Sequence, residues 1–302
     1  MSTGQYPFVR RTPMHLTFGL GLALLTLFGL VPAVLVVFFS FSNIRGIPGL
    51  PSDWVGIQNY LDFFSAARLD ENLNAGRNTF VFAFATAVAQ IVIGLAFAVL
   101  LNRRLRGVSF YRSIVFMPTV LGVTVTGLIF SLVFNSAGGP AAAVLSWFGT
   151  ESAFFGDPNL AMSLVIFVQV WSQVGITTVI FLAGLQAIPN ELYEVAAIDG
   201  ASAWQRFRWV TFPMLAPSMT ANVLLAIVNG LQSYQLAYVL TGPTNKSTQV
   251  LSLLIYVQSF GSNGAPPQSQ GYAAAVSIVQ FVLVGIIAFC ALAYLRKREA
   301  RL

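Results

Sequence analysis

The chain has 302 residues, of which 56% are hydrophobic and only 9% are charged, and its formal net charge is +6. Soluble domains carry about 25% charged residues, so this composition excludes a soluble globular protein and indicates a polytopic membrane protein. The single cysteine, Cys290, also excludes an intrachain disulfide and a cysteine metal site.

Six stretches without charge are long enough to cross a bilayer, which takes about 20 apolar residues. In chain order, the predicted spans are 16–39, 79–101, 113–134, 160–186, 217–240 and 272–294. The fold class that follows is an all-α polytopic membrane protein with six transmembrane helices. The first span is expected to stay in the protein, because its apolar run of about 24 residues is longer than that of a signal peptide. The apolar segment 249–260 is too short to span, which predicts an interfacial or re-entrant helix.

The segments outside the spans differ in charge. Residues 1–15 and 295–302 are predicted tails, 42–77 is the first outer loop, and 187–214 is the longest inner loop. With six spans, both tails share one side, and that side carries twelve of the sixteen Lys and Arg residues. The positive-inside rule therefore predicts that both termini are cytoplasmic. We expect these cations to set the topology and to contact anionic membrane lipid, so the basic charge needs no nucleic-acid partner.

The inner loop contains a compact charged segment, NELYEVAAIDGASAWQRFRW, from Asn190 to Trp209. Local signals predict two short helices, because Asn190 suits the first N-cap and Ser202 with Gln205 fits a capping box. The Asp-Gly pair at 199–200 predicts the turn between them. The segment is also rich in small residues, which let another surface approach the backbone. From these properties alone, an ordinary cytoplasmic loop lying on the membrane face is an equally good interpretation.

The same segment resembles the EAA loop of permease subunits of ATP-binding-cassette importers. That pattern is Glu-Ala-Ala, three residues, Gly, nine residues and Ile-x-Leu-Pro. The positions that match it in register are Glu194, Ala196, Gly200 and Pro213. Val195, Val210 and Phe212 depart from the pattern but keep its apolar character.

The resemblance extends over most of the chain. The segments similar to carbohydrate permeases are 54–64, 110–135, 238–242 and 247–260. The chain looks like the first (MalF- or UgpA-like) permease subunit of the maltose and glycerol-phosphate type. This resemblance implies the type I ABC importer permease fold, with a permease core at 74–294. It also implies inward transport of a sugar or sugar-like solute across a bacterial cytoplasmic membrane.

The resemblance further implies several partners: a second EAA-type permease subunit that forms a heterodimer, two ATPase subunits, and an extracytoplasmic sugar-binding protein or lipoprotein. ATP and Mg would be bound by the partner ATPase. Neither a cofactor nor a catalytic residue is expected in this chain, whose sequence has no Gly-rich phosphate loop. The inner loop would be the coupling element. The residues implied as ATPase contacts are Glu191, Glu194, Ala196, Ala197, Asp199, Gly200, Ala201 and Phe207.

No predicted span contains a charged residue, which argues against a proton-coupled path and favours a neutral solute. The fourth and fifth spans offer uncharged polar and aromatic groups, and the candidate substrate-path residues are Gln169, Ser172, Gln173, Asn229, Gly230, Gln232, Ser233 and Tyr234. The resemblance to carbohydrate permeases places five of them at or near sugar contacts, namely Gln173, Asn229, Gly230, Gln232 and Ser233. Hydrogen bonds between helices would also explain such side chains. A secondary transporter of a neutral solute is the alternative function, although it would need ionisable groups or unwound helices with ion ligands.

Overall fold

The computed structural model describes residues 14–46, 53–103, 106–261 and 269–299. In these ranges the secondary structure is helical, and the one β pairing is an isolated bridge between Ser42 and Trp54. The predicted all-α class is confirmed. Residues 1–13 of the predicted tail 1–15 lie outside the described residues, and so do residues 300–302 of the tail 295–302.

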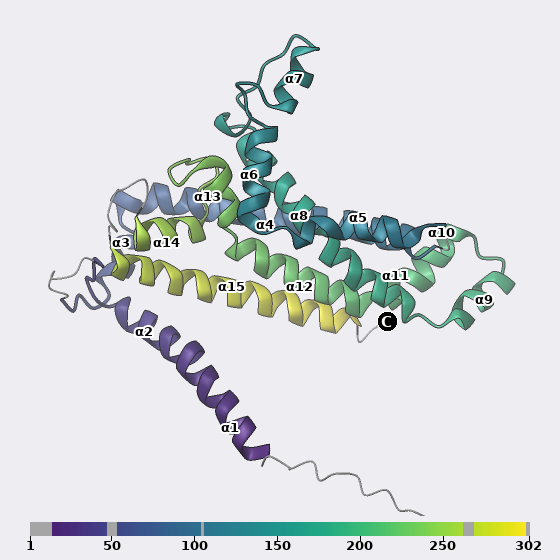
Figure 1. Ribbon diagram of the computed structural model, residues 1–302. Helices are drawn as coiled ribbons and strands as arrows, with labels where there is room; N and C mark the ends of the chain where they lie inside the picture. The colour runs from purple at the N-terminus through teal and green to yellow at the C-terminus, as the bar shows by residue number, and fades with distance from the viewer. Residues whose placement is uncertain (1–13, 47–52, 104–105, 262–268, 300–302) are drawn as a thin grey trace, which may run out of the picture.

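Four long helices form a bundle: α4 (Ala66–Leu101), α8 (Ala161–Gln186), α12 (Ala216–Gln232) and α15 (Gln270–Glu299). α4 packs against α8 and α12, and α12 packs against α15 (Figure 1). The helices α4, α8 and α15 are apolar around most of their circumference, as expected where protein lies on one side and lipid on the other. By length and hydropathy, four helices of the described residues can cross a membrane: Phe18–Phe39, α4, α8 and α15. The number rises to as many as six if each of two bent helix pairs is one span.

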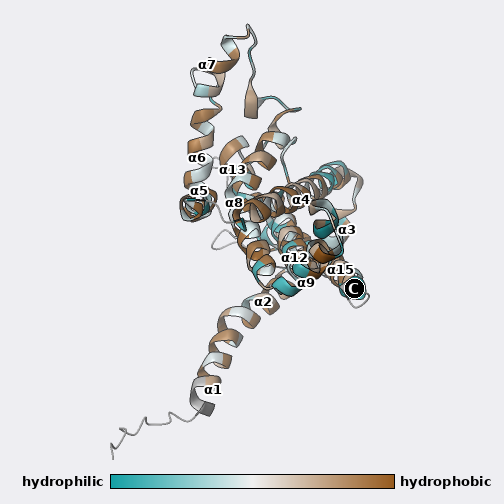
Figure 2. Cartoon of the chain, turned by 90° about the vertical axis from the view of Figure 1, so that its right-hand side faces the viewer, coloured by the Kyte–Doolittle hydropathy of each residue, from teal (hydrophilic) through white to brown (hydrophobic). Residues whose placement is uncertain are grey.

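The first predicted span, 16–39, is helical and stands apart from the bundle. It runs through α1 (Met14–Leu25), the π-helical turn η1 (Thr26–Leu30) and α2 (Val31–Phe39), and from Phe18 on none of its residues is buried. α2 packs against α15, whereas α1 leads away from the bundle (Figures 1 and 2). An apolar surface of this extent indicates contact with lipid or with another subunit.

The third predicted span, 113–134, is two helices, α5 (Val108–Val120) and α6 (Val123–Val133), whose axes meet at 99°. The prediction of one continuous helix is therefore wrong. Pro118 lies in the last turn of α5, where proline removes a backbone donor. Gly122 is extended, with φ of −63° and ψ of 146°, so the chain changes direction before α6 begins.

The second predicted span, 79–101, is part of a much longer helix, because α4 begins well before residue 79. The 36 residues of α4 make it about 54 Å long, whereas the hydrocarbon core of a bilayer is about 30 Å thick. Its early turns lie within the predicted outer loop 42–77, after the short helix α3 (Gln58–Phe63). Asn78 fixes this extension by donating a hydrogen bond to the carbonyl oxygen of Lys246 at 3.0 Å.

The fifth predicted span, 217–240, is interrupted. α12 ends at Gln232, Ser233 is extended, and a separate short helix follows, α13 (Gln235–Thr241). The segment predicted to be interfacial or re-entrant is the short apolar helix α14 (Leu251–Phe260), which packs against α15. The end of α12 is therefore a break inside the bundle, with α14 and α15 beside it.

Candidate functional site

The predicted coupling loop, 187–214, is two helices joined by a tight turn. Its elements are α9 (Asn190–Ile198), α10 (Ala203–Arg206), the π-helical turn η3 (Phe207–Thr211) and α11 (Phe212–Met214). Gly200 makes the turn with a φ of +76°, in the left-handed region that favours glycine. In Figure 2, hydrophilic residues colour much of α9, in contrast with the brown helices of the bundle.

The capping box that starts the second helix is confirmed. The Ser202 amide donates to Gln205 Oε1 at 2.7 Å, and the Gln205 amide donates to Ser202 Oγ at 3.3 Å. The N-cap predicted for the first helix is wrong by one residue. Pro189 holds that position with an extended ψ of 134°, and Asn190 is already helical. Proline is well suited there, because no helical hydrogen bond needs its missing amide.

Tyr193 and Thr211 fasten the loop to the bundle. Their hydroxyl groups lie 3.1 Å apart and share a hydrogen bond, which joins α9 to η3. The Tyr193 ring packs against the buried apolar cluster around Leu215. In the second helix, Trp204 stacks on Phe207 with ring centroids 5.7 Å apart. α9 is thus tied to the segment that leads directly into α12.

Most of the predicted ATPase contacts lie on the exposed side of this loop. Glu191, Glu194, Ala197, Asp199 and Gly200 are exposed, and Ala196, Ala201 and Phe207 are half-buried. Sequence reasoning missed Leu192, Val195 and Ile198 of α9, which are exposed as well, Ile198 by 85%. Their three-residue spacing was the available signal, since it places them on one helical face. An apolar stripe that is exposed in this way marks a surface for another protein or for the membrane.

A groove of about 1080 Å³ lies between the C-terminal end of α4 and the second helix of this loop. Its walls are mostly apolar, with Arg103 and Arg206 among the residues that line it. A second cavity, of about 250 Å³, is lined by Arg208 from η3 and Arg298 from α15. The C-terminal end of α4, the predicted coupling loop and the C-terminal end of α15 therefore lie at the same end of the bundle (Figure 1).

Two candidate substrate-path residues are brought together from different helices. Ser233 Oγ donates to Gln169 Oε1 at 3.5 Å, which links the end of α12 to α8. Ser172 is turned toward its own helix, where its hydroxyl donates to the carbonyl oxygen of Gln169 at 3.0 Å. Gln173 is half-buried and follows Gln169 by one helical turn, so the two amides share a face of α8.

Gln232 and Tyr234 lie at a cavity of about 340 Å³ that sequence reasoning did not identify. α14 and α15 supply its other walls, which include Ser252, Tyr256 and Gln280. The rings of Tyr234 and Tyr256 are stacked, with centroids 5.1 Å apart. No Asp, Glu, Lys, Arg or His is among the described residues that line the cavity. The available signal for Gln280 was its place as the one glutamine inside the last predicted span.

The other two candidates on α12 face different surroundings. Asn229 is exposed and shares a helical face with Gln232, three residues on. Gly230 is buried between helices, and a Cβ atom there would lie 2.8 Å from the Cα atom of Ala83 in α4. The position of Gly230 thus fits close helix packing rather than contact with a solute.

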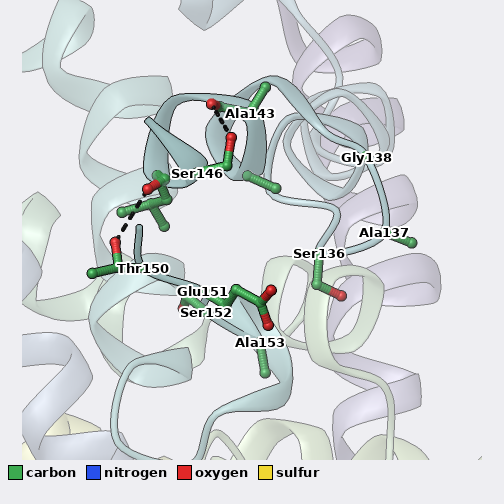
Figure 3. A pocket seen from close by; sticks show the side chains of 11 residues that line it. Ser136, Ala137, Gly138, Ala143, Ser146, Thr150, Glu151, Ser152 and Ala153 are labelled. Carbon is green, nitrogen blue, oxygen red and sulfur yellow. Dashed lines mark hydrogen bonds between the residues drawn. The ribbon is translucent and has the colours of Figure 1, made fainter. Parts of the chain in front are cut away.

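The segment between α6 and α8 forms a further cavity, of about 650 Å³ (Figure 3). Residues 136–153 form it, and they include the short helix α7 (Pro140–Ser146) that precedes the single turn η2 (Phe154–Gly156). Ser146 Oγ donates to the carbonyl oxygen of Ala143 at 2.8 Å in its wall. None of the candidate residues lines this cavity, so it is separate from the candidate site.

Comparison with known proteins places the chain among transport proteins. A family model described as "Binding-protein-dependent transport system inner membrane component" matches residues 90–301. The multiple sugar-binding transport system permease protein MsmF of Streptococcus mutans is 35% identical over 263 residues, which cover 87% of this chain and 88% of that protein. The trehalose/maltose transport system permease protein MalF of Thermococcus litoralis is 33% identical, and the match covers 80% of this chain and 79% of that protein.

A solved structure shares the fold. It is a chain of a bacterial ABC transporter involved in the import of the acidic polysaccharide alginate, and it superposes with a TM-score of 0.79. The match covers 94% of this chain and 95% of that chain at 19% sequence identity. The expected fold of an ABC importer permease is therefore confirmed.

Proposed function

The chain belongs to the family of binding-protein-dependent transport system inner membrane components, and from that premise we propose that it conducts a sugar or sugar-like solute into the cell. It is a multi-pass membrane permease subunit of an ABC importer, as the resemblance of the loop 187–214 predicted. This family membership sets aside the alternative of a secondary transporter. The observation that carries the sugar proposal is the group of uncharged amides and hydroxyls around the end of α12.

The chemistry around the end of α12 supports a neutral carbohydrate. Gln169, Gln232 and Ser233 offer hydrogen-bond donors and acceptors, and Tyr234 offers an aromatic ring. A few such groups in a mostly apolar site can orient a polyhydroxylated ligand. The names of the two relatives refer to multiple sugars and to trehalose and maltose. The transporter that shares the fold imports an acidic polysaccharide, but here no predicted span offers a cation to pair with acid groups.

Other subunits complete the importer in this proposal. They are a second EAA-type permease that forms a heterodimer, two ATPase subunits, and an extracytoplasmic sugar-binding protein or lipoprotein. The ATPase binds ATP and Mg, and this chain contributes no catalytic residue. The exposed apolar surfaces of α1, α2 and α6 are available to the second permease and to lipid. The exposed stripe of α9 is suited to a groove on an ATPase, because an amphipathic helix docks by such a face.

We expect ATPase movement to reach the solute path through α9 and α12. A displacement of α9 moves η3, because Tyr193 and Thr211 hold the two elements together. The chain then bends by 66° into α12, whose far end carries Gln232. A packed helix moves as a rigid element, so α12 connects the coupling loop to the break beside Ser233.

Both termini are proposed to be cytoplasmic, in the cytoplasmic membrane of a bacterial cell, and cysteine labelling tests this orientation. In a Cys290→Ser background, an Asn102→Cys variant should react with a membrane-impermeant maleimide only after the cells are opened. A Thr244→Cys variant should react in intact cells, since Thr244 lies on the opposite side and both positions are exposed. The reverse labelling pattern would overturn the orientation.

Uptake into vesicles tests the transported solute. The chain would be purified with its co-purifying partner subunits, reconstituted, and supplied with radiolabelled maltose, trehalose, sn-glycerol-3-phosphate and an alginate trisaccharide. ATP-dependent accumulation of a neutral sugar is the expected result, because the path lacks charged groups. Accumulation of the charged solutes alone would contradict the proposal.

A further inference from the structure

The break after α12 leaves backbone carbonyl groups without helical partners. α12 ends at Gln232, and the extended Ser233, with ψ of 136°, stops the hydrogen-bond ladder. The last carbonyl groups of any helix need other donors, and inside a membrane water does not supply them. Leu231 is only 2% exposed, so its carbonyl oxygen must be satisfied by a neighbouring side chain.

Gln280 of α15 provides that donor. Its side chain is 6% exposed, and Nε2 donates to the carbonyl oxygen of Leu231 at 2.8 Å and to Ser252 Oγ at 2.7 Å. Ser252 Oγ in turn lies 3.5 Å from the same carbonyl oxygen. One amide therefore joins the end of α12 to α14 and α15. We call this arrangement the Gln280 bridge.

The residues directly after the bridge are candidate path residues. Ser233 is held from the other side by Gln169, and Tyr234 is held by its stack on Tyr256 of α14. We propose that Gln280 is a positioning residue that holds the segment 232–234 in the geometry that meets the solute. This assignment rests on the proposed function, because the segment is a path only if the chain conducts a sugar.

Packing alone does not explain a glutamine at this position. Within the described residues, the Oε1 atom of Gln280 is buried and has no hydrogen-bond partner. A buried acceptor that is left unsatisfied destabilises the folded protein. A leucine would fill similar space without an unsatisfied acceptor, but it would take the donor away from the Leu231 carbonyl oxygen, so the useful property of the amide is its donation to Leu231 and Ser252.

Hydrogen exchange and uptake of maltose and trehalose by the assembled importer test the Gln280 bridge. In Gln280→Leu, amide exchange in residues 231–236 should rise by about tenfold, because one hydrogen-bonded end of α12 is released. For a transported sugar, KM should rise by about tenfold while the maximal rate changes less than about threefold, because ground-state positioning of the solute is lost. Ser131→Ala is the control that should leave exchange in this segment and KM unchanged, since Ser131 lies in α6 away from this cavity and its hydroxyl bonds to Leu128 of its own helix.

A conservative variant separates positioning from bulk packing. Gln280→Glu keeps the shape, and its neutral carboxyl group can still donate one hydrogen bond, whereas the ionised form cannot. With one donor in place of two, and with burial favouring the neutral carboxyl group, its KM at pH 6 should lie between the values of the unmodified importer and of Gln280→Leu. Unchanged exchange in Gln280→Leu would overturn the proposal, and so would faster exchange with an unchanged KM. Amide hydrogen exchange is measured without any solute, so it tests the Gln280 bridge even if the chain does not transport a sugar. The sugar proposal itself would fail if the unmodified importer took up neither maltose nor trehalose.

Discussion

The Gly200→Pro variant is expected to insert into the membrane at the unmodified level and to lose transport by about 100-fold. Gly200 has a φ of +76°, which proline cannot adopt, because its ring holds φ near −65°. Proline also removes the amide that donates to the carbonyl oxygen of Ala197 at 3.1 Å. The turn that aims α9 relative to α10 would be lost, while the bundle helices would be untouched. Uptake into vesicles, normalised to the amount of inserted protein, measures the effect.

A Gly200→Asn variant separates conformation from space. Asparagine tolerates the left-handed region, and no atom of the described residues lies within 4 Å of a Cβ atom at this position. Retained transport in Gly200→Asn would show that the turn is the requirement, and lost transport would show that a partner needs the room.

A second variant, Glu194→Lys, tests the charge of the same loop. Glu194 is exposed, and its replacement by lysine should also abolish transport by reversing a charge on the docking face. Normal transport in both Gly200→Pro and Glu194→Lys would contradict a coupling role for this loop.

The coupling loop was predictable from sequence at its turn and at the start of its second helix, where the signals are local. The Asp-Gly pair indicated the turn at Gly200, and Ser202 with Gln205 indicated the second helix start, because each signal acts within four residues. The outward direction of Leu192, Val195 and Ile198 was not predicted. It depends on which face of α9 the Tyr193 ring turns toward the bundle, and that is a tertiary contact.

The spans show the same division between local and tertiary causes. Charge-free stretches located the helices, since a bilayer sets their length and excludes charge. Hydropathy does not report a break inside an apolar run. The 99° bend after Pro118 and the interruption at Ser233 were therefore missed. The interruption is possible because Gln280, far along the chain, satisfies the freed carbonyl group, and no pattern around Ser233 reports that partner.

The Gly230→Val variant is expected to destabilise the folded permease by about 3 kcal/mol and to abolish transport. A Cβ atom at this position would lie 2.8 Å from Ala83 Cα and 3.2 Å from Thr86 Oγ1, so the backbone of α4 would have to move. Overpacking of this kind shifts whole helices, because packed interiors hold little free space. Thermal unfolding of the purified permease, followed by loss of the monodisperse peak in size-exclusion chromatography, measures the loss of stability.

Gly285→Val is the matched control for this substitution. Gly285 also lies within a long apolar helix, but in the part of the chain that the structure describes no atom lies within 4 Å of a Cβ atom there, so the same change should leave stability and transport nearly unaltered. The contrast decides between the two roles of Gly230, which sequence reasoning placed on the substrate path. A large loss of stability in Gly230→Val means that glycine lets α12 approach α4 and carries Asn229 and Gln232 into place on its neighbouring face. If stability were kept and only solute uptake changed, Gly230 itself would line the path, and the close contact with Ala83 would have to open in the working importer.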